Sequence, residues 1–271
     1  MTPISVFIIT KNEADRILEI INAVKKIADE VLVIDSGSSD NTCDIALRAG
    51  AKVMFNEWRG YGEQKIFGEK QCRNKWILNI DADEEVSEEL CAEISEIFSK
   101  KIDENLAGFR VKIVNKFRFE KKPKKLAYYY NQFRLYNKDF AGFSDSTIHD
   151  SVMLKSSDNQ LKISQLKNII YHQSFRSFSH WIEKINSYSQ MQANDALKKG
   201  KNTSFLKVFF TPLFAFFKAF FLRRYFIYGF NGAIYSLLFA FSRFVKAIKI
   251  RELFQAQSNR PNQLQKADSV Y

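Results

Sequence analysis

The apolar residues of the N-terminal part of the chain alternate between two spacings. Short runs of consecutive apolar residues predict buried strands at residues 4–10, 31–35, 52–55 and 76–80. Between the first two runs, Ile17, Ile20 and Ile21 recur at helical spacing, and further helices are expected after the loops at residues 36–42 and 56–62. This alternation predicts an α/β fold with a mostly parallel central sheet flanked by helices.

Beyond Gly108 the pattern predicts shorter strands of a mixed sheet, at residues 108–114, 132–136, 148–154 and 169–172. An amphipathic helix is expected before this region and a polar helix after it. The first covers residues 87–100 with Ser87 as its N-cap, and the second covers residues 179–199 and ends at Gly200. One domain spanning residues 1–200 is therefore expected.

The composition changes sharply after residue 200. Residues 201–253 are dense in phenylalanine and hold nine Lys or Arg residues but a single acid, Glu252. The stretch at residues 205–222 is barely long enough to span a bilayer and contains two lysines. We expect residues 201–255 to form an amphipathic helical segment in the plane of a membrane surface; packing on protein and a true span are the alternatives. The polar residues 256–271 are expected to be disordered.

The net charge indicates which class of partner the protein binds, and the cysteines indicate its cellular compartment. A formal net charge of +11 favours anionic partners such as nucleic acid, phosphorylated substrates or an acidic membrane surface. The sequence contains no nucleic-acid-binding motif, so binding to nucleic acid is not expected. The three cysteines lack metal or redox spacing, which indicates reduced thiols and a cytoplasmic protein.

Two aspartates, Asp81 and Asp83, follow the strand at residues 76–80. In open α/β sheets, ligands bind outside the carboxyl ends of the strands. Carboxylates this close repel each other unless a cation lies between or beside them, and Mg²⁺ or Mn²⁺ prefers such oxygen ligands. The alternative interpretation is a polar turn whose aspartate caps the next helix.

Further carboxylates are expected at the same edge of the sheet. Asp35 ends the second strand, and Glu13 and Asp40 lie in loops on that side. Such a cluster suits recognition of ribose hydroxyls, base N–H groups and a divalent cation. The sequence has no glycine-rich phosphate-binding loop, so the metal and side chains such as Lys65 would hold phosphates.

A basic, aromatic stretch at residues 112–130 contains four lysines between positions 121 and 125 and three consecutive tyrosines. It fits an acceptor platform in which aromatic rings stack on sugars and lysines contact phosphates. A solvated loop is the alternative interpretation.

Three segments together resemble the family 2 glycosyltransferases of the GT-A fold: VFIITKNE at residues 6–13, VIDSGSSDNT at 33–42 and LNIDAD at 78–83. The chain is also similar to the lipopolysaccharide-core β-1,4-glucosyltransferase group of that family. That similarity rests on residues 58–65, 132–136, 148–150 and 171–181, and on the aromatic, basic C-terminal segment. The resemblance covers about residues 3–255.

The resemblance implies roles for individual residues. The nucleotide-sugar pocket would be lined by Thr10, Asn12, Glu13, Asp35, Ser36, Gly37, Asp40, Lys65 and Asp81. The divalent cation, Mg²⁺ or Mn²⁺, would be bound by Asp81, Asp83 and His172. A strand histidine satisfied by backbone is the alternative for His172. Asp150 would be the general base, where the closer group usually has Glu. Lys65 and Ile66 stand where the wider family usually has Arg and Asn.

The implied reaction moves a sugar, glucose from UDP-glucose, onto a lipid-linked saccharide such as the lipopolysaccharide inner core. Inversion would give a β-linkage. The enzyme would lie on the inner face of the cytoplasmic membrane, bound through residues 205–254. A polyprenyl phosphate or another cell-surface glycan is an alternative acceptor. A phosphohydrolase with Asp81 as nucleophile and a non-catalytic membrane-surface scaffold are rival functions.

Overall fold

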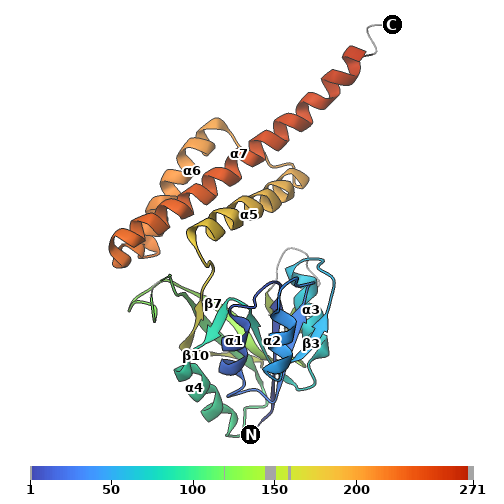
Figure 1. Ribbon diagram of the computed structural model, residues 1–271, viewed down its shortest axis with the longest axis vertical. Helices are drawn as coiled ribbons and strands as arrows, with labels where there is room; N and C mark the ends of the chain where they lie inside the picture. Colours follow the sequence, from blue (N-terminus) through green and yellow to red (C-terminus); the bar gives the residue numbers. More distant parts are fainter. Residues whose placement is uncertain (1, 119, 144–150, 158–159, 268–271) are drawn as a thin grey trace. The chain divides into compact units, whose positions relative to one another are not determined.

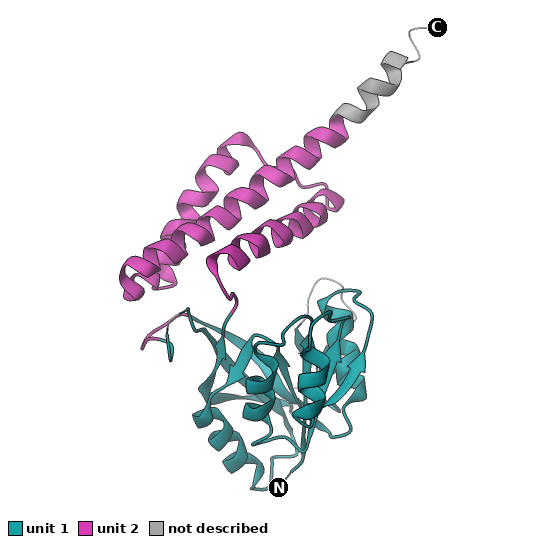
Figure 2. Ribbon diagram, viewed as in Figure 1, with its two compact units in different colours: residues 1–123, 129–173 teal, residues 124–128, 174–271 magenta. Residues whose placement is uncertain are grey.

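The computed structural model describes residues 2–118, 120–143, 151–157 and 160–267, which divide into two compact units (Figure 2). Residues 1–123 and 129–173 are called the sheet unit here. Residues 124–128 and 174–271 are called the helical unit.

An eight-stranded sheet with the order β3-β2-β1-β4-β7-β6-β10-β5 forms the sheet unit (Figure 1). Its strands are β1 (Ile4–Thr10), β2 (Glu30–Asp35), β3 (Lys52–Phe55), β4 (Trp76–Asp81), β5 (Glu84–Val86), β6 (Leu106–Asn115), β7 (Tyr129–Asn137) and β10 (Lys162–His172). The four predicted N-terminal strands pair in parallel, whereas β7 pairs antiparallel with both β4 and β6. A separate ribbon joins β8 (Ala141–Phe143) to β9 (Val152–Leu154).

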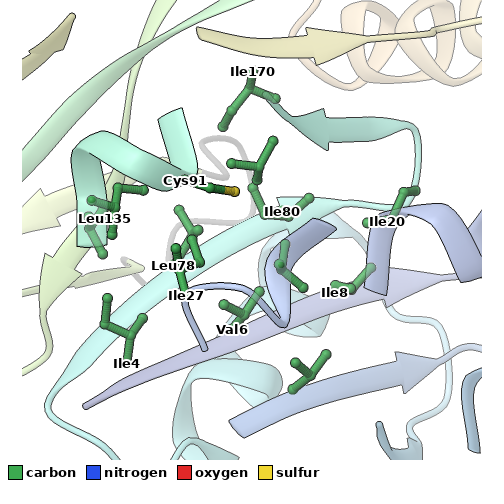
Figure 3. Close-up of a cluster of buried hydrophobic side chains, with 14 of the residues drawn as sticks. Ile4, Val6, Ile8, Ile20, Ile27, Leu78, Ile80, Cys91, Leu135 and Ile170 are labelled. Carbon is green, nitrogen blue, oxygen red and sulfur yellow. The ribbon is translucent and has the colours of Figure 1, made fainter. Parts of the chain in front are cut away.

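Helices cover both faces of the sheet because alternate residues of each buried strand point to opposite sides. On one face, Val6 and Ile8 of β1 belong to the same core as α1 (Ile17–Val24), α2 (Thr42–Arg48) and α4 (Glu88–Phe98), as Figure 3 shows in part. On the other face, Phe7 packs towards α3 (Tyr61–Gln71). A Cβ at Gly68 of α3 would lie 2.6 Å from the Phe7 ring, so this glycine lets the helix approach the sheet closely.

Strand direction decides where the polar residues gather. In the parallel ladder, Thr10 lies opposite Asp35 and Ile9 lies opposite Asp81. Since β10 is parallel to β6, and β6 and β4 are each antiparallel to β7, β10 ends at the same edge as β4. His172 therefore lies at the edge where β1, β2 and β4 also end, which is called the carboxyl edge below.

The helical unit contains α5 (Phe178–Lys198), α6 (Phe205–Phe217), the π-helix η1 (Lys218–Leu222), the 3₁₀ helix η2 (Tyr225–Tyr228) and α7 (Gly229–Ala267). Both α5 and α6 pack along α7. The Phe175 ring stacks on Trp181 with centroids 4.1 Å apart, and both rings also contact Tyr235 of α7. Because of these contacts, α5 belongs to the same unit as the C-terminal helices. The last helix, α7, extends through residue 267.

The surface of α6 and η1 is strongly apolar. Residues 205–222 have a mean hydropathy of 1.8 and are only 11% buried. Among the described residues, this is the one helical stretch long and apolar enough to cross a membrane. Ala215 and Ala219 form the buried side of this stretch, while Phe209, Phe214 and Phe217 are more than half exposed.

Candidate functional site

The ends of β1 and β2 form the first part of the candidate site. The carbonyl of Thr10 accepts hydrogen bonds from the backbone N–H of Ser36, at 3.1 Å, and from its hydroxyl, at 3.2 Å. The Thr10 Oγ1 atom is buried and has no hydrogen-bond partner among the described residues. A buried hydroxyl without a partner is costly, so this atom is a candidate contact for a ligand.

Asp35 organises the loop that follows β2. Its Oδ2 atom accepts hydrogen bonds from the backbone N–H groups of Gly37 and Ser38, at 2.8 and 2.9 Å, and Oδ1 accepts from the Ser38 hydroxyl at 2.5 Å. The backbone at Gly37 has a φ of +91°, which favours glycine there. The predicted pocket residues Asp35, Ser36 and Gly37 are thus brought together in one tight turn.

The loop after β1 is tied to the loop after β2. Asn12, with a left-handed φ of +56°, accepts a hydrogen bond from the Ser39 N–H at 2.8 Å. Asp40 accepts from the Ala14 N–H at 3.3 Å and from the backbone and hydroxyl of Thr42. Burial acts to raise the pKa of Asp40, but the hydrogen bonds from Thr42 and Ala14 together outweigh it and lower that pKa.

Glu13 lies beside these loops but faces a cation. Its Oε2 atom is 2.5 Å from Nη2 of Arg16, and Arg16 also donates from Nη1 to the carbonyl of Gln173 at 2.7 Å. Because Gln173 follows His172 at the end of β10, this pair connects the first loop to the far side of the site.

A buried ionic network surrounds Asp81. Lys65 of α3, which is 2% exposed, places Nζ 3.1 Å from Asp81 Oδ1. Arg134 of β7 places Nη2 3.1 Å from Asp81 Oδ2 and 2.8 Å from Glu84 Oε1, and it donates from Nη1 to Asn79 at 2.6 Å. The second oxygen of Glu84 accepts from the Asp81 N–H at 3.0 Å, which closes the turn between β4 and β5.

The two carboxyls of this network respond differently to their surroundings. Burial acts to raise the pKa of Asp81, but the charges of Lys65 and Arg134 overcome it and lower that pKa to about 2. Burial dominates at Glu84 and raises its pKa, although Arg134 opposes the change. Asp81 is therefore ionised at neutral pH and already neutralised by two cations of the protein.

Asp83 lies next to His172. The Asp83 Oδ2 atom is 3.4 Å from Nε2 of His172, and Nδ1 of the same ring lies 3.1 Å from Oδ1 of Asn115 on β6. Burial acts to lower the pKa of His172, but the hydrogen bond and charge of Asp83, with the charges of Glu84 and Asp81, raise it. Asn115 thus orients the His172 ring, and Asp83 is coupled to it electrostatically.

Two of the three predicted metal ligands, Asp83 and His172, lie side by side. Among the described residues, no three His, Cys, Asp or Glu side chains converge closely enough to hold a metal ion together. Asp83 and His172 offer adjacent oxygen and nitrogen donors, a combination that Mn²⁺ and similar cations accept. Asp81 is instead paired with Lys65 and Arg134, so its role as a direct metal ligand stays a prediction.

The structure therefore brings most of the predicted residues to the carboxyl edge, in two neighbouring groups. One contains Thr10, Asn12, Asp35 and Asp40, and the other contains Lys65, Asp81, Asp83 and His172. Gln64 links them, since its side-chain amide donates to Ser36 Oγ at 3.1 Å and it precedes Lys65. The predicted general base Asp150 lies outside the described residues.

Sequence reasoning assigned no role to Arg134, Glu84, Arg16 or Asn115. Arg134 is an arginine flanked by apolar residues in a strand, at Phe133 and Leu135. Successive side chains of a strand point to opposite faces of the sheet, so Arg134 points away from Phe133 and Leu135. The strand pattern therefore does not predict that Arg134 is also buried. Only the sheet order shows that Asn79, Asp81 and Glu84 meet it.

A mixed sheet with acidic loops at its carboxyl edge and helices on both faces defines this chain as a GT-A-type α/β protein. Residues 5–162 match Glycosyl transferase family 2. The chain belongs to this family and is a glycosyltransferase.

Two relatives and one solved structure illustrate the similarity. An uncharacterized glycosyltransferase of Rickettsia bellii is 48% identical over 92% of this chain and 86% of the relative. The lipopolysaccharide core biosynthesis glycosyltransferase LpsC of Rhizobium meliloti is 28% identical over 96% of each chain. Glucosyl-3-phosphoglycerate synthase of Mycobacterium tuberculosis, solved with Mn²⁺, uridine diphosphate and phosphoglyceric acid, aligns with a TM-score of 0.42 and 17% identity. That alignment covers 75% of this chain and 80% of the other.

Proposed function

We propose that this glycosyltransferase moves a sugar, glucose from UDP-glucose, to a lipid-linked saccharide of the lipopolysaccharide-core type, with inversion to a β-linkage. The observation that carries the proposal is the position of two polar groups on either side of the end of β1. The Asp35 turn lies on one side and the Asp81–Asp83–His172 group on the other. The similarity to LpsC, a lipopolysaccharide core biosynthesis glycosyltransferase, supports the class of acceptor.

The nucleoside is assigned to the first group. Thr10, whose hydroxyl has no partner in the described part of the chain, and the rigid turn at residues 35–38 would contact the base and ribose. The hydrogen bonds that Asp35 accepts from its own loop hold this turn in place before the donor binds, which lowers the entropy cost of binding.

The diphosphate is assigned to the second group. Asp83 and His172 would hold a divalent cation, which when bound neutralises the charge of the leaving diphosphate. Lys65 and Arg134 keep Asp81 ionised, and Arg134 with Glu84 fixes the turn that carries Asp83. The proposed role of these cationic side chains is thus to position carboxylates rather than to bind phosphate directly.

Asp150 is proposed as the general base that takes the proton of the acceptor hydroxyl. Attack from the face opposite the leaving diphosphate is a single displacement, so it inverts the anomeric centre without a covalent enzyme intermediate. A transferase acting on a polyprenyl phosphate would use the same groups.

The helical unit is proposed to keep the enzyme on the inner face of the cytoplasmic membrane. Exposed phenylalanines of α6 and the excess of basic residues between 201 and 253 support this placement. It would bring the sheet unit to an acceptor that is anchored in lipid.

The test compares Asp83→Asn and His172→Ala with Asp139→Asn, an exposed aspartate paired with Lys75 in a turn. Sugar transfer from UDP-glucose and Mn²⁺ binding by titration calorimetry are measured, with thermal unfolding as the check of folding. We expect the first two variants to lose Mn²⁺ binding and metal-dependent transfer, and Asp139→Asn to retain both. Unchanged Mn²⁺ binding and turnover in a folded Asp83→Asn protein would refute the metal assignment.

A further inference from the structure

A short segment of the basic, aromatic stretch, residues 124–128, groups with the helical unit and not with the strands around it in sequence. Arg224 donates from Nη1 to the carbonyl of Leu126 at 3.3 Å. The Arg223 guanidinium lies 5.1 Å from the centre of the Tyr128 ring and 4.4 Å from that of Phe239 on α7. The segment is thus held on the helical unit by two consecutive arginines.

The backbone at this contact is unusual on both sides. Leu126 has a φ of +66° and Arg224 a φ of +57°, and these are two of the three non-glycine residues with positive φ among the described residues. Such conformations cost about 1 kcal/mol or more for a residue with a side chain. Burial does not offset this cost at Leu126, because the residue is 74% exposed.

Large apolar side chains close to Arg223 and Arg224 in sequence are exposed to solvent, as Leu126 is. Leu222, two residues before Arg224, is 74% exposed, and Phe221 and Phe226 are 54% and 47% exposed. Soluble proteins rarely leave a contiguous cluster of large apolar side chains in water unless it binds something.

The charges around the cluster indicate what covers it. Lys124 and Lys125 are exposed in the segment itself, Arg224 is exposed beside it, and the region from 201 to 253 holds nine basic residues with one acid. A second copy of the chain would bring like charges against one another, and a nucleic acid would leave the apolar side chains in water. The headgroups and upper acyl chains of an anionic bilayer satisfy both the cations and the apolar side chains.

We propose that residues 124–128 and the adjoining η1–η2 turn form one bilayer-docking surface for anionic lipid. Leu126, Phe221 and Leu222 enter the membrane interface, while Lys124, Lys125 and Arg224 contact lipid phosphates. The inference rests on the proposed function in one respect, because the docking surface would serve an acceptor held in lipid.

The docking surface is joined directly to the catalytic sheet in sequence. Tyr129, the first residue of β7, follows Tyr128, and β7 carries Arg134 of the Asp81 network. Lipid contact at residues 124–128 therefore constrains the start of a strand that reaches the candidate site.

The test measures sedimentation of the full-length chain with vesicles of phosphatidylcholine, with and without phosphatidylglycerol. The variants are Leu126→Asn, in which asparagine tolerates the left-handed backbone, and the double variant Lys124→Gln/Lys125→Gln. Matched controls are Met191→Asn, at a 51% exposed position of α5, and Lys198→Gln/Lys199→Gln at the C-terminal end of that helix, which changes the net charge equally. Circular dichroism checks that each variant is folded.

We expect the chain to bind anionic vesicles more tightly than neutral ones, and binding to weaken with added salt. Removing each lysine should weaken binding to anionic vesicles about fivefold, Leu126→Asn should weaken it as well, and the controls should bind like the parent chain. Equal binding of folded variants and parent would overturn the proposal. So would a dimer in the absence of vesicles that Leu126→Asn dissociates. The assay contains no sugar donor, so its failure is distinct from a failure of the transferase assignment.

Discussion

Arg134 Nη2 lies 2.8 Å from Oε1 of Glu84, and both side chains are almost completely buried. The other carboxylate oxygen of Glu84 accepts the backbone N–H of Asp81 at 3.0 Å, so the pair fixes the start of the turn between β4 and β5. Asp83 occupies that turn and faces His172. The buried pair of Arg134 and Glu84 therefore orients Asp83, which is the residue proposed to bind the cation.

Replacing Arg134 with methionine should destabilise the sheet unit strongly. The change leaves the buried Glu84 and the partly buried Asp81 near each other with one cation fewer, and breaking a buried ion pair such as Arg134–Glu84 costs about 3–5 kcal/mol. Urea unfolding would measure the loss. Arg134→Lys keeps the charge but cannot reach three partners, so a smaller loss is expected. Equal stability of the methionine variant and the parent chain would show that the network is not needed for folding.

Tyr136 should make the stability of the chain fall at high pH. Its hydroxyl donates to Glu69 Oε2 at 2.6 Å, and burial together with the charge of Glu69 raises its pKa well above the ordinary value of 10.0. The unfolded chain releases this proton near the ordinary value while the folded chain retains it. The contribution of Tyr136 is therefore complete below that pH and is lost as pH rises towards the folded-state pKa.

The variant Tyr136→Phe separates this effect from other titrations. It should lose about 1 kcal/mol of stability at neutral pH, because one hydrogen bond is removed. At pH values above the ordinary tyrosine pKa, the difference in the free energy of unfolding between the variant and the parent chain should shrink. Urea unfolding across that pH range tests this, and a constant difference between the two proteins would contradict it.

Two glycines with positive φ should respond differently to alanine. At Gly108 of β6, with φ +153°, a Cβ would lie 2.3 Å from the Leu135 carbonyl oxygen, so Gly108→Ala forces strands apart and should cost more than about 3 kcal/mol. At Gly200, with φ +63°, a Cβ meets nothing within 4 Å, and Gly200→Ala should cost only about 1 kcal/mol. Thermal unfolding of both variants measures the difference, and equal losses would count against the steric explanation.

The exposed side of α6 should be required for membrane association. Phe210 and Phe217 are 45% and 57% exposed, and we expect Phe210→Gln/Phe217→Gln to move the chain from the membrane to the soluble fraction. Met191→Gln on α5 removes an equally exposed apolar side chain and should leave the distribution unchanged. Protection of α6 from protease on both sides of a vesicle would indicate a span in place of in-plane binding.

The sequence by itself determined the strand–helix alternation, the parallel N-terminal half of the sheet and the family. Buried parallel strands read as continuous apolar runs, and the loops that follow them place Thr10, Asp35 and Asp81 at one edge whatever the details of packing. Ser87 caps α4 by accepting from the Leu90 N–H at 3.2 Å, a contact between near neighbours that local sequence can predict.

Only the tertiary structure decided which charges meet. Arg134 lies 53 residues from Asp81 in sequence, and its pairing with Asp81 and Glu84 depends on the insertion of β7 beside β4. The same holds for Leu126, which contacts Arg224 98 residues away. Periodicity describes which side of an element is apolar, but the strand order and the docking of distant segments follow from the packing of the whole chain, which no local pattern encodes.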